Sequence, residues 1–359
     1  MKNLAYNNSE IRFGSLVESG FNELLKSDKY KNAKKVILVD ENVFDLWMEH
    51  FLTTFDSLNK AEIIQIPAGE ENKTIEICSQ IWGALTEYEI GRNDLIINIG
   101  GGVVTDMGGF IASTFKRGMP FINIPTTLLA QVDASIGGKT GVDFGPHKNQ
   151  IGVFSDADFV FIDTHYLTTL PVVELESGYA EMLKHGLIAY KNYWTDLRNL
   201  DPKKNPEKLL GKVRTSVSIK RDIVAEDHLE TGKRKILNFG HTIGHALEGL
   251  CLQKKKTIPH GYGVAWGIIA ESYISKELKL ISTTEFEDIN TSLRSIYPPL
   301  DVTIADLPIL KKLLMNDKKN SNSTINFSLI KGIGQAIYNQ TVADELIDKS
   351  FNFILNHED

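Results

Sequence analysis

The histidines of this chain are concentrated in one stretch. Three of the nine, His241, His245 and His260, fall between residues 230 and 263. Neutral imidazole is a good ligand for a first-row divalent metal ion, and residues four apart lie on one face of a helix. The spacing of His241 and His245 therefore suits two ligands of one zinc ion. Thr242 stands where the metalloprotease pattern has glutamate, so a pair of packing or capping histidines is an equal alternative.

A basic run precedes these histidines and favours the metal-binding interpretation. Lys233, Arg234 and Lys235 stand just upstream, and Asn238 and Gly240 follow them. Cations beside a metal ion form a site for an anion, and glycine lets the backbone approach a ligand closely. The stretch therefore predicts chemistry on a small anionic substrate.

Another helical segment carries three groups that could do chemistry. Glu181, Lys184 and His185 have spacings of three and four residues, which place a carboxylate, an amine and an imidazole on one face. The same spacing is also typical of an ordinary solvent-exposed stripe.

Glycines mark a possible nucleotide site in the first third. Gly100, Gly101 and Gly102 follow an apolar strand and precede a helix, an arrangement that suits a pyrophosphate, although the spacing is not G-x-G-x-x-G. A tight strand-to-helix turn is the alternative. Asp40 and Asn42 follow an earlier strand, where they would hold a ribose hydroxyl or cap a helix.

A second polar cluster contains glycines and lysines. Asp133, Lys139, Lys148 and Asn149 lie in it, and lysines beside a glycine pair suit a phosphate or another oxyanion. The P-loop spacing is absent, so ATP is not implied. An exposed loop with incidental lysines is the alternative.

Two kinds of segment must position these residues. Up to about residue 163, apolar runs alternate with helical patterns, which predicts a parallel sheet covered on both faces. The predicted strands are residues 35–39, 61–66, 94–99, 121–124 and 159–162. Beyond residue 171 the periodicity is mostly helical. The predicted helices there are residues 172–190, 206–226, 241–250, 262–278 and 284–295, with one strand at 325–329. We therefore expect domains over residues 1–165 and 166–359.

Composition excludes several classes of protein. A net charge of −7 argues against a nucleic-acid-binding surface, and no apolar stretch reaches the length of a membrane span or resembles a signal peptide. Two distant cysteines, Cys78 and Cys251, favour a reducing cytoplasm over a disulfide framework.

Taken together, these residues resemble the 3-dehydroquinate synthase family of sugar phosphate cyclases. The resemblance extends from about residue 36 to residue 334. It is densest in GGGVVTDMGGFIASTFKRG, NIPTTLLAQVDASIGGKTGVDFGPHKNQIG, LESGYAEMLKHG and RKILNFGHTIGHALE. It implies a Rossmann-like α/β N-terminal domain, a mostly α-helical C-terminal domain, bound NAD⁺, a Zn²⁺ or Co²⁺ ion and a homodimer. The implied reaction converts 3-deoxy-D-arabino-heptulosonate 7-phosphate to 3-dehydroquinate and phosphate, with NAD⁺ reduced and then regenerated.

The resemblance also assigns roles to single residues. It implies metal ligands Glu181, His241 and His260, which makes His245 an acid/base residue instead of a ligand, together with catalytic Glu230 and Lys184. The implied NAD⁺ contacts are Asp40, Asn42, Glu70, Lys73, Gly101, Gly102, Val103, Asp106, Thr126, Thr127, Lys139, Lys148, Thr168 and Thr169. The implied substrate contacts are Arg117, Asp133, Lys139, Asn149, Lys184, Lys220, Arg234, Asn238, His245, Lys318 and Lys319, with Arg117 reaching across the dimer.

Some positions depart from the family pattern. Thr105 and His147 replace common glycines, and the interval from His241 to His260 is slightly long. A related cyclase for another sugar phosphate and a metal-dependent NAD polyol dehydrogenase are the alternative functions.

Overall fold

The computed structural model of this protein describes residues 3–7, 9–145, 147–315 and 325–356. The chain forms two compact units. The first contains Met1–Pro171 and Lys204–Arg221, and the second contains Val172–Lys203 and Asp222–Asp359. The domain division expected after residue 165 stays a prediction, because compactness alone does not test which segments fold independently.

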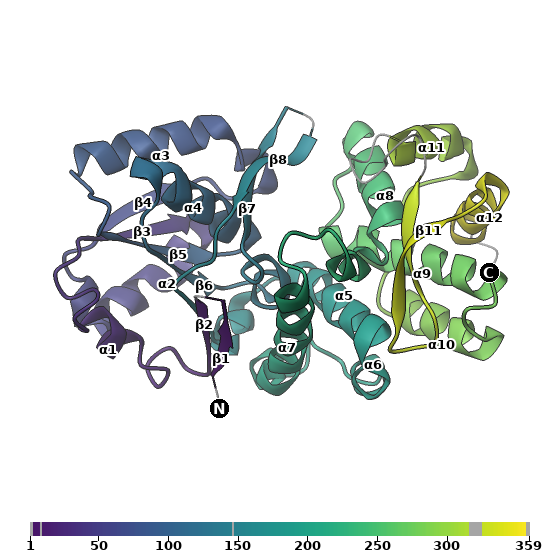
Figure 1. Cartoon of the computed structure of the whole chain (residues 1–359), viewed down its shortest axis with the longest axis horizontal. Helices are drawn as coiled ribbons and strands as arrows, with labels where there is room; N and C mark the ends of the chain where they lie inside the picture. Colours follow the sequence, from purple (N-terminus) through teal and green to yellow (C-terminus); the bar gives the residue numbers. More distant parts are fainter. Residues whose placement is uncertain (1–2, 8, 146, 316–324, 357–359) are drawn as a thin grey trace. The chain divides into compact units, whose positions relative to one another are not determined.

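A seven-stranded sheet forms the centre of the first unit (Figure 1). Its strand order is β1-β2-β9-β6-β5-β3-β4, and every neighbouring pair is parallel except β1 and β2. The strands are β1 (Leu4–Tyr6), β2 (Ser9–Phe13), β3 (Lys35–Asp40), β4 (Glu62–Ile66), β5 (Leu95–Gly100), β6 (Phe121–Pro125) and β9 (Phe159–Ile162). The predicted parallel sheet is therefore confirmed.

Helices cover both faces of this sheet, as Figure 1 shows. Alternate strand residues such as Ile97 pack with α1 (Phe21–Leu25) and α2 (Glu41–Thr54) in one apolar core. The opposite face is covered by α3 (Ile75–Glu87) and α4 (Gly102–Thr114).

Close approach of α4 to the sheet depends on a glycine. A Cβ atom on Gly108 would lie 2.0 Å from Oδ1 of Asn98, a buried strand residue of β5. Only glycine leaves room for this contact, so Gly108 brings the helix, and with it the preceding glycine turn, down onto the strand ends.

A hairpin adds a second, two-stranded sheet to the first unit. It pairs β7 (Lys139–Phe144) with β8 (His147–Phe154) in antiparallel register. β7 packs on α4, whereas β8 is exposed along almost its whole length. The sequence indicated only a polar, glycine-containing cluster here, because glycines interrupt the alternation that marks a strand.

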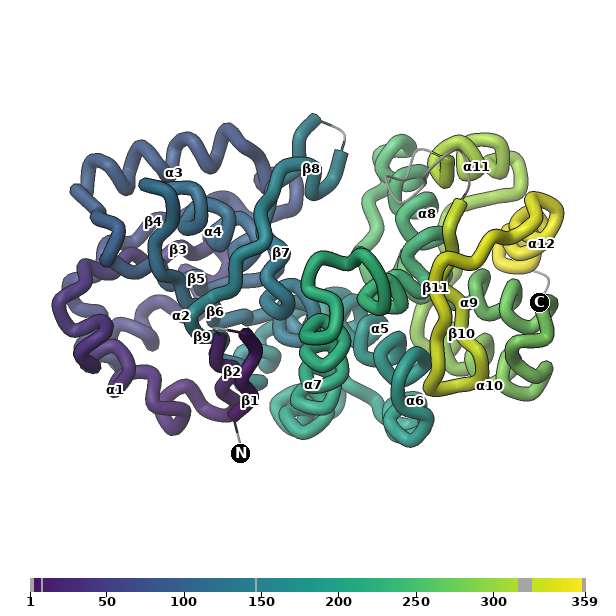
Figure 2. The backbone as a smooth tube through the Cα atoms, viewed as in Figure 1, coloured from purple at the N-terminus to yellow at the C-terminus, as the bar shows by residue number. Residues whose placement is uncertain are grey.

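The second unit is built around α9 (His260–Glu277), which is buried along most of its length. It packs against α5 (Val172–Ala189), α8 (His241–Gln253), α10 (Thr283–Arg294) and α12 (Asp344–Leu355). The remaining elements are α6 (Lys191–Arg198), α11 (Leu307–Met315), β10 (Asn326–Ile330) and β11 (Ala336–Thr341). Figure 2 traces β10 and β11 as neighbouring strands beside α9. The helical second half and its single predicted strand are thus confirmed, and β11 is an addition.

One further helix, α7 (Leu210–Glu226), contributes to both units, with its residues up to Arg221 belonging to the first. None of the helices in the described ranges is long and apolar enough to cross a membrane.

Glycines bring α8 and α9 into direct backbone contact. A Cβ atom on Gly267 would lie 1.9 Å from the carbonyl oxygen of Gly240, and one on Gly244 would lie 2.9 Å from that of Gly263. These pairs make the two helices antiparallel neighbours with no side chains between them at these points. The histidines that begin α8 and α9 are therefore held in a fixed relation.

Candidate metal and nucleotide sites

Glu181 lies in the middle of α5 and is completely buried. The exposed fractions of Glu181, Lys184 and His185 are 0%, 1% and 0%. The alternative of a solvent-exposed stripe is therefore wrong for these three residues, because α5 is packed on several sides at this level. Buried ionisable groups need partners, and the Lys184 ammonium forms an ion pair with Oε2 of Glu181.

Two imidazoles face the same carboxylate. Nε2 of His241 lies 3.3 Å from Oε1 of Glu181, and Nε2 of His260 lies 3.6 Å from it. One ligand atom from each residue lies within 4.8 Å of the others. Oε1 of Glu181 accepts no hydrogen bond from any described residue, whereas Oε2 is paired with the Lys184 ammonium. A buried carboxylate oxygen that faces two ring nitrogens has the ligand types and the spacing that a divalent metal ion requires.

The other ring nitrogens fix how the imidazoles are oriented. Nδ1 of His241 lies 3.2 Å from the carbonyl oxygen of Phe239, and Nδ1 of His260 lies 2.6 Å from Oε1 of Glu248. An acceptor at Nδ1 favours the tautomer with its proton there, which leaves the Nε2 lone pair facing Glu181. Glu248 was not predicted, although its position seven residues after His241 puts both on one helical face.

Charges in this cluster shift the pKa values in different directions. Burial opposes ionisation of Glu181, but the positive charge of the adjacent Lys184 outweighs it and holds the pKa of that carboxyl well below its usual range. Burial, together with Lys184, lowers the pKa of His241 to about 3. Burial also disfavours protonated His260, but Glu248 and Glu181 outweigh it and raise the pKa of that imidazole to about 10. An added cation would lower the His260 pKa again, because like charges repel.

A second ligand set overlaps the first. His245, Glu248 and His260 also bring one possible ligand atom each within 4.8 Å of the others. His245 stands one turn after His241 on α8, and the two ring centroids are 5.2 Å apart. The hypothesis from helical spacing, that His245 is a ligand, therefore needs an experiment.

Replacing His245 with alanine is expected to leave the metal content unchanged and to lower turnover by about 10²–10⁴-fold, the usual contribution of a general acid or base. Metal analysis of the purified variant checks this, with His241→Ala measured in parallel. If both variants lose metal to the same extent, His245 is a ligand and its acid/base assignment is wrong.

Other predicted residues of the second unit form hydrogen-bonded groups. Nδ2 of Asn238 donates to Oε1 of Glu230 at 2.5 Å. Arg234 is 2% exposed, and its Nη1 donates to the carbonyl oxygen of His228 at 2.5 Å. These bonds fix the orientation of a carboxylate and a guanidinium, which are groups able to bind hydroxyls and anions. The predicted contacts Lys318 and Lys319 lie outside the described residues.

In the first unit, several predicted cofactor residues lie at the carboxyl ends of the parallel strands, along one edge of the sheet. The parallel register pairs Val39 with Ile99 and Gly100 with Pro125, so the segments that follow β3, β5 and β6 leave the sheet together. β3 lies between β4 and β5, the point at which the chain reverses its direction across the sheet. Open α/β sheets bind ligands at such a point.

This edge has features of a nucleotide site. α4 begins directly after the glycine turn, and no side chain caps its N-terminus. A Cβ atom on Gly101 would lie 2.9 Å from Cγ2 of Thr127, so the turn and the end of β6 are in close contact. The Thr126 hydroxyl is buried without a hydrogen-bond partner in the described chain. Uncapped N–H groups and an unused hydroxyl fit a dinucleotide.

The helix-capping alternative for Asp40 is confirmed, because its Oδ1 accepts a hydrogen bond of 3.0 Å from the Val43 N–H. This contact leaves the proposed role toward ribose untested. The remaining predicted cofactor residues are spread over neighbouring elements. Asn42 and Val103 lie in α2 and α4, Glu70 in a 3-10 turn before α3, Lys139 and Lys148 in the hairpin, and Thr168 and Thr169 in the 3-10 segment Thr164–Thr169.

Two buried lysines join other predicted residues. Nζ of Lys73 donates to Asp106 at 2.6 Å and to Asn149 at 2.7 Å. Burial disfavours the charged Lys73, but attraction to Asp106 and Glu70 outweighs it and raises the pKa of the ammonium. Nζ of Lys220 donates to Oδ1 of Asp133 at 2.6 Å. The structure thus brings together predicted cofactor and substrate contacts that are far apart in sequence.

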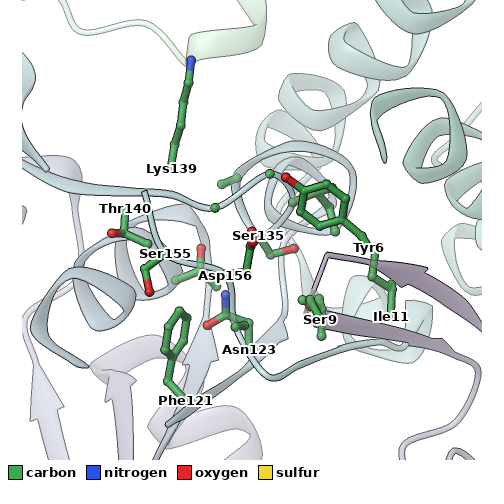
Figure 3. A pocket seen from close by; sticks show the side chains of 17 residues that line it. Tyr6, Ser9, Ile11, Phe121, Asn123, Ser135, Lys139, Thr140, Ser155 and Asp156 are labelled. Carbon is green, nitrogen blue, oxygen red and sulfur yellow. The ribbon is translucent and has the colours of Figure 1, made fainter. Parts of the chain in front are cut away.

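A separate pocket, open to solvent, lies beside β2 and β6 (Figure 3). Tyr6, Asn123, Ser135 and Asp156 line it. Of the predicted site residues, only Lys139 contributes to this lining, and Figure 3 shows its side chain directed away from the others labelled. Apart from Lys139, the residues that line this pocket are therefore not the predicted cofactor contacts. Thr105, one of the departures from the family pattern, also lines it.

Comparison with known families matches most of the chain. The profile of the 3-dehydroquinate synthase N-terminal domain matches residues 63–177, and that of the C-terminal domain matches residues 178–320. The 3-dehydroquinate synthase of Parabacteroides distasonis is 42% identical over 338 residues, covering 94% of this chain and 95% of the relative.

Solved structures share the fold. A 2-epi-5-epi-valiolone synthase from Streptomyces hygroscopicus, with NAD⁺ and Zn²⁺ bound, superposes with a TM-score of 0.84 at 24% identity, covering 99% of this chain and 98% of its own. A 2-deoxy-scyllo-inosose synthase complexed with carbaglucose-6-phosphate, NAD⁺ and Co²⁺ gives a TM-score of 0.83 at 25% identity and covers 99% of both chains.

Proposed function

The chain belongs to the 3-dehydroquinate synthase family, and we propose that it synthesises 3-dehydroquinate, the function that its geometry supports best. In this proposal, Glu181, His241 and His260 hold the divalent metal ion of the reaction. The buried Glu181 carboxylate is the observation that carries the proposal, since its Oε1 faces two imidazoles while its Oε2 is paired with Lys184. The related cyclases with Zn²⁺ or Co²⁺ and NAD⁺ support the same two cofactors here.

The substrate is a sugar phosphate, 3-deoxy-D-arabino-heptulosonate 7-phosphate, and the products are 3-dehydroquinate and phosphate. When bound, NAD⁺ accepts and returns a hydride, and the divalent ion polarises a substrate hydroxyl. We expect the uncapped start of α4 and the Thr126 hydroxyl to hold the dinucleotide.

Residues of the second unit supply charge and proton transfer. The Lys184 ammonium is buried beside Glu181, where a fixed positive charge stabilises negative charge on the reacting sugar. His245, with its ring 5.2 Å from that of His241, is the proposed proton acceptor and donor. Arg234, which is buried and donates to the carbonyl oxygen of His228, is the proposed partner of an anionic group of the substrate, because a guanidinium binds two oxygens at once.

Residues of the first unit position the substrate in this proposal. Buried Lys220 forms an ion pair with partly exposed Asp133, and Lys73 orients the Asn149 amide. Groups that are already bonded to one another lose little conformational freedom when they bind a ligand, which is how positioning lowers the barrier.

The functional form in this proposal is a homodimer in the cytoplasm. The exposed strand β8 supports pairing, because Phe144 of β7 and Phe154 of β8 are 55% and 46% exposed and a strand edge at the end of a sheet readily pairs with another chain. The cysteines Cys78 and Cys251 are both free and buried, which supports a reducing compartment.

A phosphate-release assay tests the function. With the heptulosonate phosphate, a divalent metal and NAD⁺ below the enzyme concentration, each NAD⁺ is expected to support many turnovers, because its hydride is returned. A polyol dehydrogenase would instead accumulate NADH in proportion to substrate, which absorbance measures directly. Accumulation of NADH without phosphate release would contradict the proposed function. The two structurally similar cyclases are only 24% and 25% identical, so the 42% identical relative favours 3-dehydroquinate as the product.

A further inference from the structure

Glu271 is a buried carboxylate on α9 that binds the beginning of α8. Its exposed fraction is 0%. Oε2 accepts a hydrogen bond of 2.6 Å from the Gly240 N–H, and Oε1 accepts one of 3.1 Å from the Ile243 N–H. Both oxygens of one side chain thus hold the backbone on either side of His241, the residue with which α8 begins.

The start of α8 needs such an acceptor from elsewhere. Gly240 precedes the helix in a left-handed conformation, with φ of 82°, and has no side chain to cap it. The first N–H groups of a helix lack partners within the helix, and a negative charge there is favoured by the helix dipole. Ser, Thr or Asp at the preceding position usually provides this acceptor locally. Here a residue on a neighbouring helix provides it.

Glycine packing leaves the start of α8 little freedom to move. A Cβ atom on Gly240 would lie 2.5 Å from Cγ1 of Ile268, and one on Gly267 would lie 1.9 Å from the Gly240 carbonyl oxygen. The backbone before His241 therefore rests on α9, one turn before Glu271. Because α9 itself begins with His260, one helix carries one of the two imidazoles and holds the other in place.

We propose that Glu271 is a positioning residue for the divalent metal site, which it serves by fixing the backbone around His241 so that Nε2 faces Glu181. The proposal rests on the metal site described under the proposed function. It predicts that Glu271 contributes to metal affinity, and not only to the stability of the helix pair.

Glu271→Gln is the test, because glutamine keeps the size of the side chain and one acceptor oxygen. Its amide group would face a backbone N–H, so one of the two bonds is lost. The Kd for Co²⁺, measured by competition with a chelating dye, is expected to rise about 10–100-fold, the usual cost of changing a group that supports a ligand. The increase in Tm caused by a fixed Co²⁺ concentration should shrink accordingly.

The matched control is Glu277→Gln, which removes the same charge from an exposed position on the same helix and should leave the Kd unchanged. Glu271→Asp keeps the charge but shortens the side chain by one methylene group. Glu271→Asp should also weaken Co²⁺ binding by about tenfold or more if the position of the carboxylate relative to the start of α8 matters. It serves as the deciding variant if Glu271→Gln does not fold.

Three outcomes are distinguishable. In the first, folded Glu271→Gln or Glu271→Asp binds Co²⁺ as tightly as the wild type, and its Tm is lowered by the same amount with and without metal. Glu271 would then only cap α8, and the proposal would be wrong. If the wild-type protein binds no Co²⁺, or Glu181→Gln binds it as tightly as wild type, the metal site itself is wrong. Weakened binding in Glu271→Gln alongside abolished binding in Glu181→Gln supports both.

Discussion

Glu181→Ala is expected to lose its metal ion and its turnover together while the fold persists. The substitution removes the only carboxylate in the proposed ligand set and leaves two imidazoles. A catalytic metal ion supplies several kcal/mol of transition-state stabilisation, so its loss corresponds to roughly a thousandfold or more in rate. Metal analysis by mass spectrometry and the phosphate-release assay measure the two effects.

The loss of Glu181 also leaves Lys184 buried without its ionic partner, which costs about 3–5 kcal/mol of stability in comparable cases. Glu181→Gln therefore accompanies the alanine variant, because it retains the volume of the side chain. Circular dichroism of both variants checks the fold, and exposed Glu287 on α10, replaced by alanine, is the control for loss of a carboxylate. Stoichiometric metal in folded Glu181→Ala would show that the ligand assignment is wrong.

The second large effect is expected from Arg117. It follows Phe115 and Lys116 in a 3-10 turn after α4, is exposed, and has a left-handed backbone with φ of 68°. Within the described chain it forms no hydrogen bond or ion pair. An arginine held in an unfavourable backbone conformation without a local partner is consistent with a role toward another molecule. We infer that it binds the substrate phosphate of the second subunit, since its planar fork holds two phosphate oxygens at once.

Complementation between two inactive variants tests this inference. Arg117→Ala and Lys184→Ala are each expected to be nearly inactive. After unfolding and refolding in equal amounts, about half the dimers are mixed. If Arg117 acts across the dimer, each mixed dimer contains one site with both changes and one intact site. About a quarter of wild-type activity should then return.

Lys116→Ala, at the adjacent exposed position, is the control and is expected to remain active on its own. Subunit exchange is confirmed independently by native mass spectrometry of tagged chains. If mixed dimers form but no activity returns, Arg117 acts within its own subunit or has no role in binding phosphate.

Local sequence pattern predicted most of the architecture. Apolar runs of four to six residues predicted the parallel strands β3, β4, β5, β6 and β9, although not β2. Helical periodicity identified α5, α8, α9 and α10 to within a few residues. Periodicity is a property of neighbouring residues, so it is readable without tertiary information. It was weakest where a strand is exposed on both faces or broken by glycine, as in β8, because neither case leaves an alternating pattern.

The types and local spacing of the reactive residues were also set by the sequence. It placed His241 and His245 one turn apart and put Glu181 and Lys184 on one helical face. It left open whether that face is exposed, because spacing along a helix says nothing about what packs against it. The burial of Glu181 depends on the packing of α9 and α6 against α5, which the spacing of residues along α5 does not reveal.

Tertiary structure alone decided which groups meet. Glu181, His241 and His260 begin or occupy three different helices, and only helix packing brings their ligand atoms within 4.8 Å of one another. The same packing supplied Glu248 to His260 and Glu271 to the start of α8. The sequence pattern encodes contacts three or four residues apart, whereas these contacts depend on where whole helices lie. The glycines that bring α8 against α9 are therefore as necessary to this arrangement as the histidines themselves.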